Sequence, residues 1–595
     1  MYKGYMNKFL KIDLSRKEYS FSTPPPELFE EFIGGKGMGL KLLIDMGIIT
    51  QDPLSPENPL IFTTGPFTGS MVQTSARSTL VTKSPLTGTF LDSHMGGNWG
   101  PALKRSGIDY LIITGRSEKP VYLHISPDKV EFIDAAPLWG KGIFHTEKSL
   151  MEKYPKSRIV SIGPAGENKV KFACIGSDLY RQFGRGGAGA VMGSKNLKSI
   201  VVEGDKKIEI FDPENFKELN GALTKDILAH PGPAKRDELG TNMWIRMGHE
   251  DGKFLPTRNF RDVQFEDYEG ITSETMKKKL NWKSVSCFNC VIKCSKLAHW
   301  KDLEVEGPEY ETTAYLGSGC GIGDAESVAY SNYLCDDLGL DTISAGVVTS
   351  FAMEAFEKGI LTSSDVDGIE LNFGNAEAQF SLLNKIANRE GIGDLLAEGT
   401  RIASEKIGKG SDYFAIQIAG MELSGVNIKG SSSMGLTLAT SDFASHTRFW
   451  SCSDEMAGNL TYENTPLFIK EGQDDVNVRN SLVVCDFVPF GLDRLAPVLQ
   501  ALTGLKTDVQ KLLDLGEKIS NMTRMYNYKN GRSRSSDTLP KRFFAEKQEA
   551  GMFKGKYLTK EIFSDWLDKY YNVRGWDSDG FPTPEKLSEL SIEKL

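Results

Sequence analysis

Three of the eight cysteines crowd into one short segment, at Cys287, Cys290 and Cys294, and this spacing restricts the chain more than any other feature. The other five are scattered over 595 residues, so the cysteines do not form a disulfide framework. Iron–sulfur clusters commonly take closely spaced cysteines and a distant one, whereas structural zinc favours paired C-x2-C modules. We therefore expect a cluster with Cys485 as its fourth ligand, and His299 would be the fourth ligand of a zinc site.

The composition is that of a globular protein, with 40% hydrophobic and 25% charged residues. The net charge of -9 argues against a nucleic-acid binder, and Gly, at 60 residues, exceeds its usual share of about 7%. Lysines interrupt the apolar positions of the first 14 residues, and no window approaches the roughly 20 apolar residues of a membrane span. We expect a cytoplasmic protein that binds a small molecule or a protein, and neither nucleic acid nor membrane.

Two kinds of hydrophobic pattern divide the chain. Short β-branched and aromatic runs predict strands at 60–63, 110–114, 121–125, 130–133, 158–162 and 199–202. Helical periodicity then prevails, at 213–228, 325–337, 347–358, 376–389, 395–406 and 509–525. This order predicts an α+β fold in which a β-rich domain over residues 1–208 is followed by two mainly α-helical domains over 209–412 and 413–595.

A glycine-rich segment over residues 184–189 matches the G-x-G-x-x-G pattern of dinucleotide-binding folds. The polar residues before it do not form an apolar strand, and Gly193 and Asn196 interrupt the helix that should follow. Arg181 and Arg185, on the same backbone, are suited to binding phosphate through guanidinium forks and free N–H groups. A phosphate site, a dinucleotide site and a simple turn between strands all stay open.

Other residues could contribute to a site, although none is specific by itself. Arg77 and the glycine-rich stretch 93–100 could complete an anion pocket. Asp336 and Asp341 flank a Gly that is placed for a helix C-cap. Two such carboxylates can accept hydrogen bonds from an aminopyrimidinone edge, but a solvated helix end is the commoner explanation.

His446 and Glu311 are candidates for general acid/base work. A lone His is more often structural than catalytic. Spacing alone does not choose between His446 and the histidines at 94, 145 and 249.

Taken together, these segments resemble the tungsten-containing aldehyde:ferredoxin oxidoreductase family. The most specific likenesses are, in chain order, the stretch 185–198, the cysteine triplet, the stretch 306–311 and the stretch 335–344. Shorter likenesses at 34–37, 82–88, 163–168 and 539–543 extend the resemblance over essentially the whole chain. It implies a β-rich domain that binds a tungsten bis-pterin cofactor, with molybdenum as the alternative metal, two helical domains that cover it, and a [4Fe-4S] cluster close by.

The resemblance also implies roles for individual residues. The positions of the pterin phosphates fall on Arg77, His94, Gly96, Arg181, Gln182, Gly184 and Arg185. The remaining cofactor positions fall on Asp336, Asp341, Arg448, Asn480 and Asp486. Mg2+ would bridge the phosphates through the backbone carbonyls of His94 and Gln182. His446 and Glu311 would handle the protons and orient the substrate carbonyl.

Several positions depart from the family's pattern. His94 and Gln182 stand where Asn and Ala are common, but a backbone carbonyl does not depend on the side chain. Asn480 replaces an Asp and offers no bidentate carboxylate. Arg448 replaces a Lys and gains a fork of donors.

A further departure concerns assembly. In the dimeric members, a Glu-x-x-His pair holds an iron between subunits, and here the corresponding residues are Tyr330 and Tyr333. We therefore expect no bridging iron. A homodimer through this helix would be held by Tyr packing, and otherwise both rings are buried within one subunit.

The activity that the resemblance implies is oxidation of a small aldehyde and water to a carboxylic acid, with electrons leaving through the cluster to ferredoxin or another electron-transfer protein. The alternative within the family is a low-potential reductase of an acyl or aromatic-acyl thioester, working as a subunit of a larger electron-transfer complex. A different class is a dinucleotide dehydrogenase, stabilised by zinc or a cluster, that uses residues 184–189.

Overall fold

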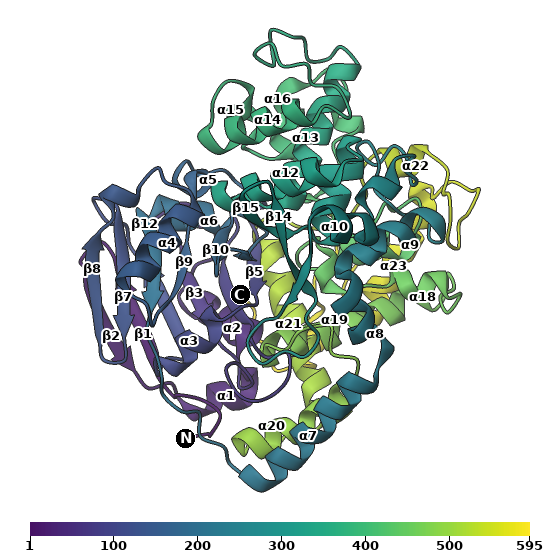
Figure 1. Cartoon of the computed structure of the whole chain (residues 1–595). Coiled ribbons are helices and arrows are strands. Elements are labelled where there is room, and N and C mark those ends of the chain that lie inside the picture. Colours follow the sequence, from purple (N-terminus) through teal and green to yellow (C-terminus); the bar gives the residue numbers. More distant parts are fainter.

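The computed structural model describes all 595 residues, and two six-stranded sheets dominate its N-terminal third (Figure 1). The first sheet has the order β2-β1-β6-β3-β4-β5. Its strands are β1 (Phe9–Asp13), β2 (Glu18–Ser22), β3 (Leu60–Thr63), β4 (Ser78–Lys83), β5 (Phe90–Met95) and β6 (Tyr110–Thr114). Only β1 and β6 run parallel, and the other neighbours pair antiparallel.

The second sheet has the order β11-β10-β9-β12-β7-β8. Its strands are β7 (Val121–Ser126), β8 (Lys129–Asp134), β9 (Arg158–Ser161), β10 (Ile175–Ser177), β11 (Arg181–Phe183) and β12 (Leu197–Val202). The strand before the glycine-rich segment, β11, is an edge strand that pairs antiparallel with β10. A dinucleotide fold needs a parallel strand at this place, so the dinucleotide alternative is wrong.

Short helices and two small sheets complete the surroundings of these strands. The helices are α1 (Pro26–Phe32), α2 (Gly35–Asp45), α3 (Trp99–Arg105), α4 (Ile143–Lys153), α5 (Pro164–Glu167) and α6 (Ala188–Ser194). The small sheets lie later in the chain and consist of β13 (Lys283–Val285), β14 (Ser295–Trp300) and β15 (Leu303–Gly307), and of β16 (Gln417–Ile418) and β17 (Met421–Glu422).

Helices make up most of the remaining chain, which confirms the predicted α+β class with its N-terminal β-rich part. The first group is α7 (Pro213–Ala229), α8 (Pro231–Leu239), α9 (Trp244–Glu250), α10 (Ser273–Lys279), α11 (Tyr310–Thr312), α12 (Ala325–Leu338), α13 (Thr342–Glu357), α14 (Ala376–Asn388), α15 (Ile392–Leu396) and α16 (Thr400–Ile407). The second is α17 (Ser432–Thr440), α18 (Cys452–Met456), α19 (Thr465–Leu482), α20 (Leu492–Thr503), α21 (Val509–Lys529), α22 (Arg542–Ala545), α23 (Lys560–Arg574) and α24 (Pro584–Glu589).

Local sequence explains where several of these helices begin and end. The side chains of Asp212, Asp324 and Asp508 accept hydrogen bonds from the first turns of α7, α12 and α21, as N-caps do. The single helix expected at 395–406 is wrong, because the chain breaks between α15 and α16 at Gly399, whose φ is +86°. The helix expected from residue 347 begins earlier, at Thr342, where Asp341 caps it.

The hydrophobic cores cross the expected domain divisions. Phe29 and Tyr110 of the β-rich part share one core with Leu482 of α19 and Leu499 of α20. Helices α19 and α21 pack against α2, and α7 packs against α20 (Figure 1). The domain divisions at residues 208 and 412 therefore stay predictions, because each of the two large hydrophobic cores contains residues from both sides of both divisions.

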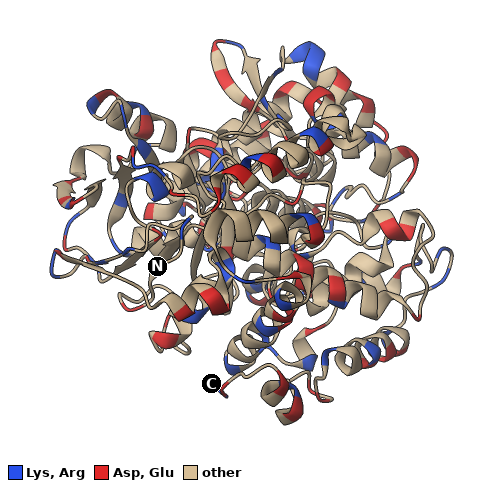
Figure 2. Ribbon diagram, turned by 90° about the horizontal axis from the view of Figure 1, so that it is seen from below, with Lys and Arg blue, Asp and Glu red and all other residues tan.

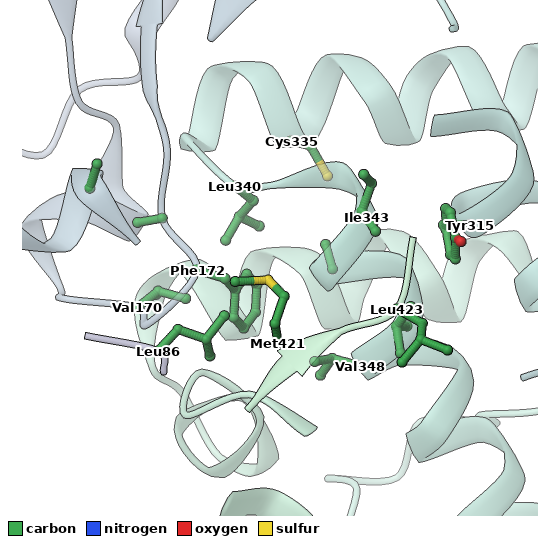
Figure 3. Packing of buried hydrophobic residues seen from close by; sticks show 14 of the residues in the cluster. Leu86, Val170, Phe172, Tyr315, Cys335, Leu340, Ile343, Val348, Met421 and Leu423 are labelled. Atoms are coloured by element: carbon green, nitrogen blue, oxygen red, sulfur yellow. The ribbon is translucent and has the colours of Figure 1, made fainter. Parts of the chain in front are cut away.

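A second contact between the parts is visible at close range. Val170 and Phe172, from the β-rich part, lie beside Met421 of β17 and Val348 of α13 (Figure 3). All four side chains are fully or almost fully buried. This closely packed apolar contact fixes the position of the helices relative to the strands. It therefore also fixes the size of the space between them.

The surface carries charges of both signs. Basic and acidic residues are interspersed over the helices and loops in the view from below (Figure 2). None of the helices combines the length and the apolar character that crossing a bilayer requires.

Candidate functional site

A cavity of about 580 Å³ brings together segments that are far apart in the sequence. All the candidate site residues except Arg448 and Asn480 line it, namely Arg77, His94, Gly96, Arg181, Gln182, Gly184, Arg185, Cys287, Cys290, Cys294, Glu311, Asp336, Asp341, His446, Cys485 and Asp486. Its volume lies in the range of small-molecule and cofactor sites.

The four thiols expected to hold a cluster meet at one part of this cavity. Cys287, Cys290 and Cys294 lie on the connection between β13 and β14, and Cys485 follows the end of α19. All four are half-buried, and burial raises the pKa of the Cys485 thiol to about 11. The backbone N–H of Cys485 donates to the carbonyl of Thr74 at 3.1 Å, which ties this thiol to the β-rich part.

The zinc alternative lacks support from the structure. His299 lies on β14, paired with Glu304 of β15, and does not line the cavity. No three His, Cys, Asp or Glu side chains lie close enough together to hold a single metal ion.

The other four cysteines are buried and free. The thiol of Cys320 donates to the carbonyl of Tyr315 at 3.3 Å. Cys335 points into an apolar cluster beside Leu340 and Ile343 (Figure 3). Cys174 lines the cavity without belonging to the cysteine segment. Burial raises the pKa of all four thiols, as expected for cysteines that act as small apolar residues.

Four arginines bring positive charge to the cavity, namely Arg77, Arg181, Arg185 and Arg236. Nη1 of Arg77 lies 3.1 Å from Oδ2 of Asp486. Nε of Arg185 lies 3.1 Å from Oδ2 of Asp341, and its Nη2 donates to the carbonyl of Glu422 at 2.6 Å. The third nitrogen of Arg185, Nη1, is buried and has no partner. A buried guanidinium donor without a partner is costly, so this atom marks a place for an anionic group.

Two glycines leave room that a side chain would fill. A Cβ atom on Gly96, which follows β5, would lie 2.8 Å from Sγ of Cys287. Gly184, which follows β11, would place its Cβ in open space. Gly96 is thus required for the position of a thiol, whereas Gly184 keeps backbone accessible from the cavity.

Asp336 and Asp341 lie on either side of the chain reversal from α12 to α13, which Gly339 makes with a φ of +79°. They are 3% and 5% exposed, so the explanation as a solvated helix end is wrong. Asp336 accepts hydrogen bonds from Nε2 of Gln182 at 2.6 Å and from Asn332 at 3.3 Å. Burial and the neighbouring Asp337 raise the pKa of Asp336 well above its usual range.

Glu311 and His446 are neighbours in the lining of the cavity. Oε1 of Glu311 lies 3.4 Å from Nδ1 of His446, and Oε2 accepts the backbone N–H of Gly425 at 3.1 Å. Burial raises the pKa of Glu311 to about 8. Burial and the charge of Arg185 lower the pKa of His446 to about 3. At neutral pH the pair is therefore an uncharged acid beside an uncharged imidazole.

The backbone around Glu311 is irregular. Glu311 lies on the short helix α11, which continues directly into a π-helical turn over Thr313–Gly317. Such turns are rare and frequently occur at functional sites, because they redirect a side chain without ending the helix.

Sequence reasoning missed the aromatic wall beside this pair. Trp244 of α9 and Trp450 both line the cavity, and their ring centroids lie 5.3 Å apart. The ring of Trp450 stands perpendicular to that of His446 at 6.1 Å. The sequence alone could not predict this contact, because the two tryptophans are about two hundred positions apart.

Arg448 lies behind the cavity wall, only 4% exposed as a side chain. Its Nη1 and Nη2 donate to the two carboxylate oxygens of Asp92 at 3.2 and 2.5 Å, and its Nε lies 2.9 Å from Asp442. Asp92 also contacts Nε2 of His94 at 2.7 Å, and Lys36 at 3.6 Å. The fork of Arg448 is thus occupied, and its contact with a cofactor stays a prediction that the geometry does not favour.

Asn480 also lies outside the cavity lining. It is buried in α19, and its carbonyl is so close to Gly35 that a Cβ there would lie 2.1 Å from it. Sequence reasoning missed Asp92 and Lys36. Asp92 could have been noticed as the one acidic residue of β5, whereas Lys36 shares α2 with the charged Lys41 and Asp45 and gave no comparable signal. Only buried charges that are paired are tolerated in such segments.

Tyr330 and Tyr333 lie on the outer side of α12 in an aromatic group. The ring of Tyr330 stacks on Trp300 at 4.4 Å and meets Phe380 edge-on at 4.8 Å, and Tyr333 contacts Phe144 at 5.1 Å. Both tyrosines remain half-buried. The absence of a bridging iron stays a prediction.

A β-rich base and a helical cover around four thiols, an arginine-rich cavity and an acid–histidine pair define a cofactor-dependent oxidoreductase. Two family models match the chain, the N-terminal domain of aldehyde ferredoxin oxidoreductase over residues 9–204 and its domains 2 and 3 over residues 218–592. The chain belongs to the aldehyde ferredoxin oxidoreductase family, which is a family of enzymes.

Curated relatives span the whole chain. The tungsten-containing aldehyde ferredoxin oxidoreductase of Pyrococcus horikoshii is 38% identical and that of Pyrococcus furiosus 36%, each over 100% of both chains. The WOR-like subunit of an aliphatic sulfonate oxidoreductase from Pyrococcus furiosus is 32% identical over 99% of this chain and 97% of its own. Among solved structures, the BamBC active-site complex of benzoyl coenzyme A reductase with 1,5-dienoyl-CoA has a TM-score of 0.87 at 27% identity, covering 100% of this chain and 98% of that one.

Proposed function

We propose that this protein oxidises aldehydes to carboxylic acids with a tungsten bis-pterin cofactor and passes the electrons through a [4Fe-4S] cluster to ferredoxin. The overall reaction consumes one aldehyde and one water and releases one carboxylic acid, two protons and two electrons. The observation that carries the proposal is the single cavity that holds the four thiols, the arginines and the Glu311–His446 pair. The tungsten-containing relatives, at 36–38% identity over the full chain, support it.

The residues present fit an anionic pterin cofactor. The unpartnered Nη1 of Arg185 and the half-buried Arg77 and Arg181 supply donors for phosphate groups. Gly184 keeps open space beside them. Asp336 presents a buried carboxyl whose raised pKa would fall on meeting the amino donors of a pterin ring.

The same fit extends to the cluster and to a cation. Four thiols meet the ligand count of a [4Fe-4S] cluster, and the guanidinium of Arg181 nearby offsets thiolate charge. A Mg2+ ion that accompanies the pterin phosphates would be held by the backbone carbonyls of His94 and Gln182. When bound, the metal–pterin group would supply a two-electron redox step that no side chain can perform, and the cluster would release electrons one at a time.

The chain's own contribution to the reaction is proton handling and orientation. Glu311 carries a proton at neutral pH and can donate it, or a hydrogen bond, to a carbonyl oxygen in the cavity. His446 is uncharged at neutral pH, and a pKa of about 3 makes it a weak base, so it would orient the substrate carbonyl by hydrogen bonding and would not accept a proton from water. The tryptophans at 244 and 450 present flat apolar surfaces that exclude water and orient a substrate beside this pair.

The test combines metal analysis with substrate panels. We expect tungsten and about four iron atoms per chain, and reduction of a viologen dye by short aldehydes such as acetaldehyde and benzaldehyde. Zinc as the only metal, or metal-loaded protein that oxidises none of these aldehydes, would contradict the proposal.

The second candidate is reduction of an acyl or aromatic-acyl thioester by a larger complex. The likeness to the BamBC complex favours it, since its TM-score of 0.87 covers the whole chain. Adding benzoyl-CoA, together with a reduced low-potential dye as electron donor, to the panel separates the two candidates, because a thioester reductase turns over benzoyl-CoA and leaves free aldehydes untouched.

A further inference from the structure

The segment that carries the three clustered cysteines is strongly basic. Between residues 275 and 301 the chain has seven Lys and no Asp or Glu, although the whole protein has a net charge of -9. Runs of like charge usually form solvated surface without a specific function. A function for this run therefore requires support from the structure.

Most of these lysines are free of partners. Lys279 pairs with Asp324, and Lys296 is buried. The remaining five are exposed and have no carboxylate within ion-pair distance, namely Lys277, Lys278, Lys283, Lys293 and Lys301. Their charges therefore act on whatever approaches this face.

The buried Lys296 links segments that lie next to the cysteine connection. Its Nζ donates to the carbonyl of Arg236 at 3.0 Å, to the carbonyl of Lys293 at 3.2 Å and to Oγ of Ser284 at 3.2 Å. These bonds hold α8, β13 and the cysteine connection together, and each of these three segments carries an exposed lysine at or next to a bonded residue, namely Lys235, Lys283 and Lys293. We call these three residues the basic patch. Asp237 and Glu238 are the acids beside it in the chain, and the patch keeps an excess of positive charge.

An exposed apolar residue, Met71 of the loop between β3 and β4, is hydrogen-bonded to this connection through its backbone. Nδ2 of Asn289, between two of the cysteines, donates to the carbonyl of Met71 at 2.8 Å. The side chain of Met71 is 56% exposed. The neighbouring thiol of Cys290 is half-buried, so the expected cluster lies near the molecular surface here. Apolar centre and charged rim are the usual anatomy of a protein interface.

We propose that an acidic one-electron carrier protein docks over the connection between β13 and β14, with its carboxylates on the basic patch and its apolar surface on Met71. The proposal rests on the proposed function, because it needs a cluster at the four thiols. The net charge of -9 opposes the approach of an acidic carrier to the protein as a whole. The local basic surface attracts it, and the two effects together orient the carrier toward the thiols.

The test measures binding directly, with a purified acidic two-cluster bacterial ferredoxin as the probe. In the variant Lys235→Glu/Lys283→Glu/Lys293→Glu we expect the affinity at low salt to fall at least about tenfold. The loss should shrink at high salt, because the Debye length falls from about 10 Å at 0.1 M to about 3 Å at 1 M. The Lys→Arg version of the same variant should retain binding.

The matched control changes the net charge equally at remote sites. Lys119→Glu/Lys156→Glu/Lys554→Glu alters three exposed lysines without carboxylate partners that lie outside the cysteine segment. We expect it to bind ferredoxin nearly as the parent does. Equal losses in both variants would show a general charge effect and overturn the docking site.

A second readout separates this proposal from the proposed function. Aldehyde-dependent reduction of benzyl viologen, a small dye that needs no docking site, should not fall in the basic-patch variant. Unchanged ferredoxin binding in that variant, with dye-linked activity intact, would overturn the docking site alone. Absence of dye-linked activity in the parent would overturn the proposed function, and the binding data would still decide whether the patch binds an acidic carrier.

Discussion

Oε1 of Glu311 lies 3.4 Å from Nδ1 of His446, and both groups are uncharged at neutral pH because burial shifts their pKa values in opposite directions. This relationship joins residues that are 135 positions apart, one on α11 and one on a turn after α17. Pairs of groups whose environments shift their pKa values strongly are typical of active sites. The first prediction follows from it.

Glu311→Gln should lower aldehyde turnover by about 10²–10⁴-fold, because the amide cannot transfer a proton. In the parent, activity that needs the protonated acid should fall as pH rises through about 8, the pKa of Glu311, whereas an ordinary Glu loses its proton near pH 4.3. A pH–rate profile measures this fall of activity at alkaline pH. Metal analysis of Glu311→Gln should find that tungsten is retained. Loss of tungsten in place of slow turnover would show that Glu311 holds the cofactor instead.

Cys485→Ser should abolish or strongly diminish the cluster, because a [4Fe-4S] cluster takes four protein thiolates. The matched control is Cys174→Ser, since Cys174 lines the same cavity but is fully buried outside the cysteine segment. Iron content and the spectroscopic signal of the reduced cluster measure both. A full signal in Cys485→Ser would show that another residue is the fourth ligand.

Gly96→Ala should displace the thiol of Cys287, because the new Cβ would lie 2.8 Å from its Sγ. We expect reduced iron content with the sheet intact by circular dichroism. Gly184→Ala is the control, because its Cβ meets no atom within 4 Å and should leave the iron content unchanged. Equal iron in both variants would contradict the assigned role of Gly96.

Arg448→Ala should destabilise the protein by about 3–5 kcal/mol, because it leaves the buried Asp92 without its bidentate partner. The exposed pair of Arg494 and Asp226 provides the control, and Arg494→Ala should cost less than about 1 kcal/mol. Thermal melting of the cofactor-loaded proteins compares the two. A melting temperature of Arg448→Ala as high as that of the control would show that the buried pair contributes little.

Tyr330 and Tyr333 should bind no iron, because a phenol is a poorer metal ligand than the carboxylate and imidazole that it replaces. Metal analysis of the cluster-depleted protein checks this, and one firmly bound iron per two chains would refute it. The variant Tyr330→Asp would disrupt the stacking on Trp300. Size-exclusion chromatography of this variant would show whether the aromatic group joins two subunits.

The sequence by itself determined the local features. Cysteine spacing indicated a cluster, and the Asp–Gly–Asp pattern around residue 339 predicted a helix end. The hydrophobic pattern located the six strands and four of the six helices that it predicted to within a few residues. These features are local because spacing, capping and side-chain alternation act over a few residues. The resemblance to a family then supplied the residues of the site.

Only the tertiary structure decided which of those residues meet. It brought His446 to Glu311, chosen from several equivalent histidines, and it turned Arg448 away from the cavity toward Asp92. It also buried Asp336 and Asp341, which the sequence could equally place at a solvated helix end. Burial and long-range contact depend on how whole sheets and helices pack, and they set the pKa values and ion pairs on which the chemistry depends.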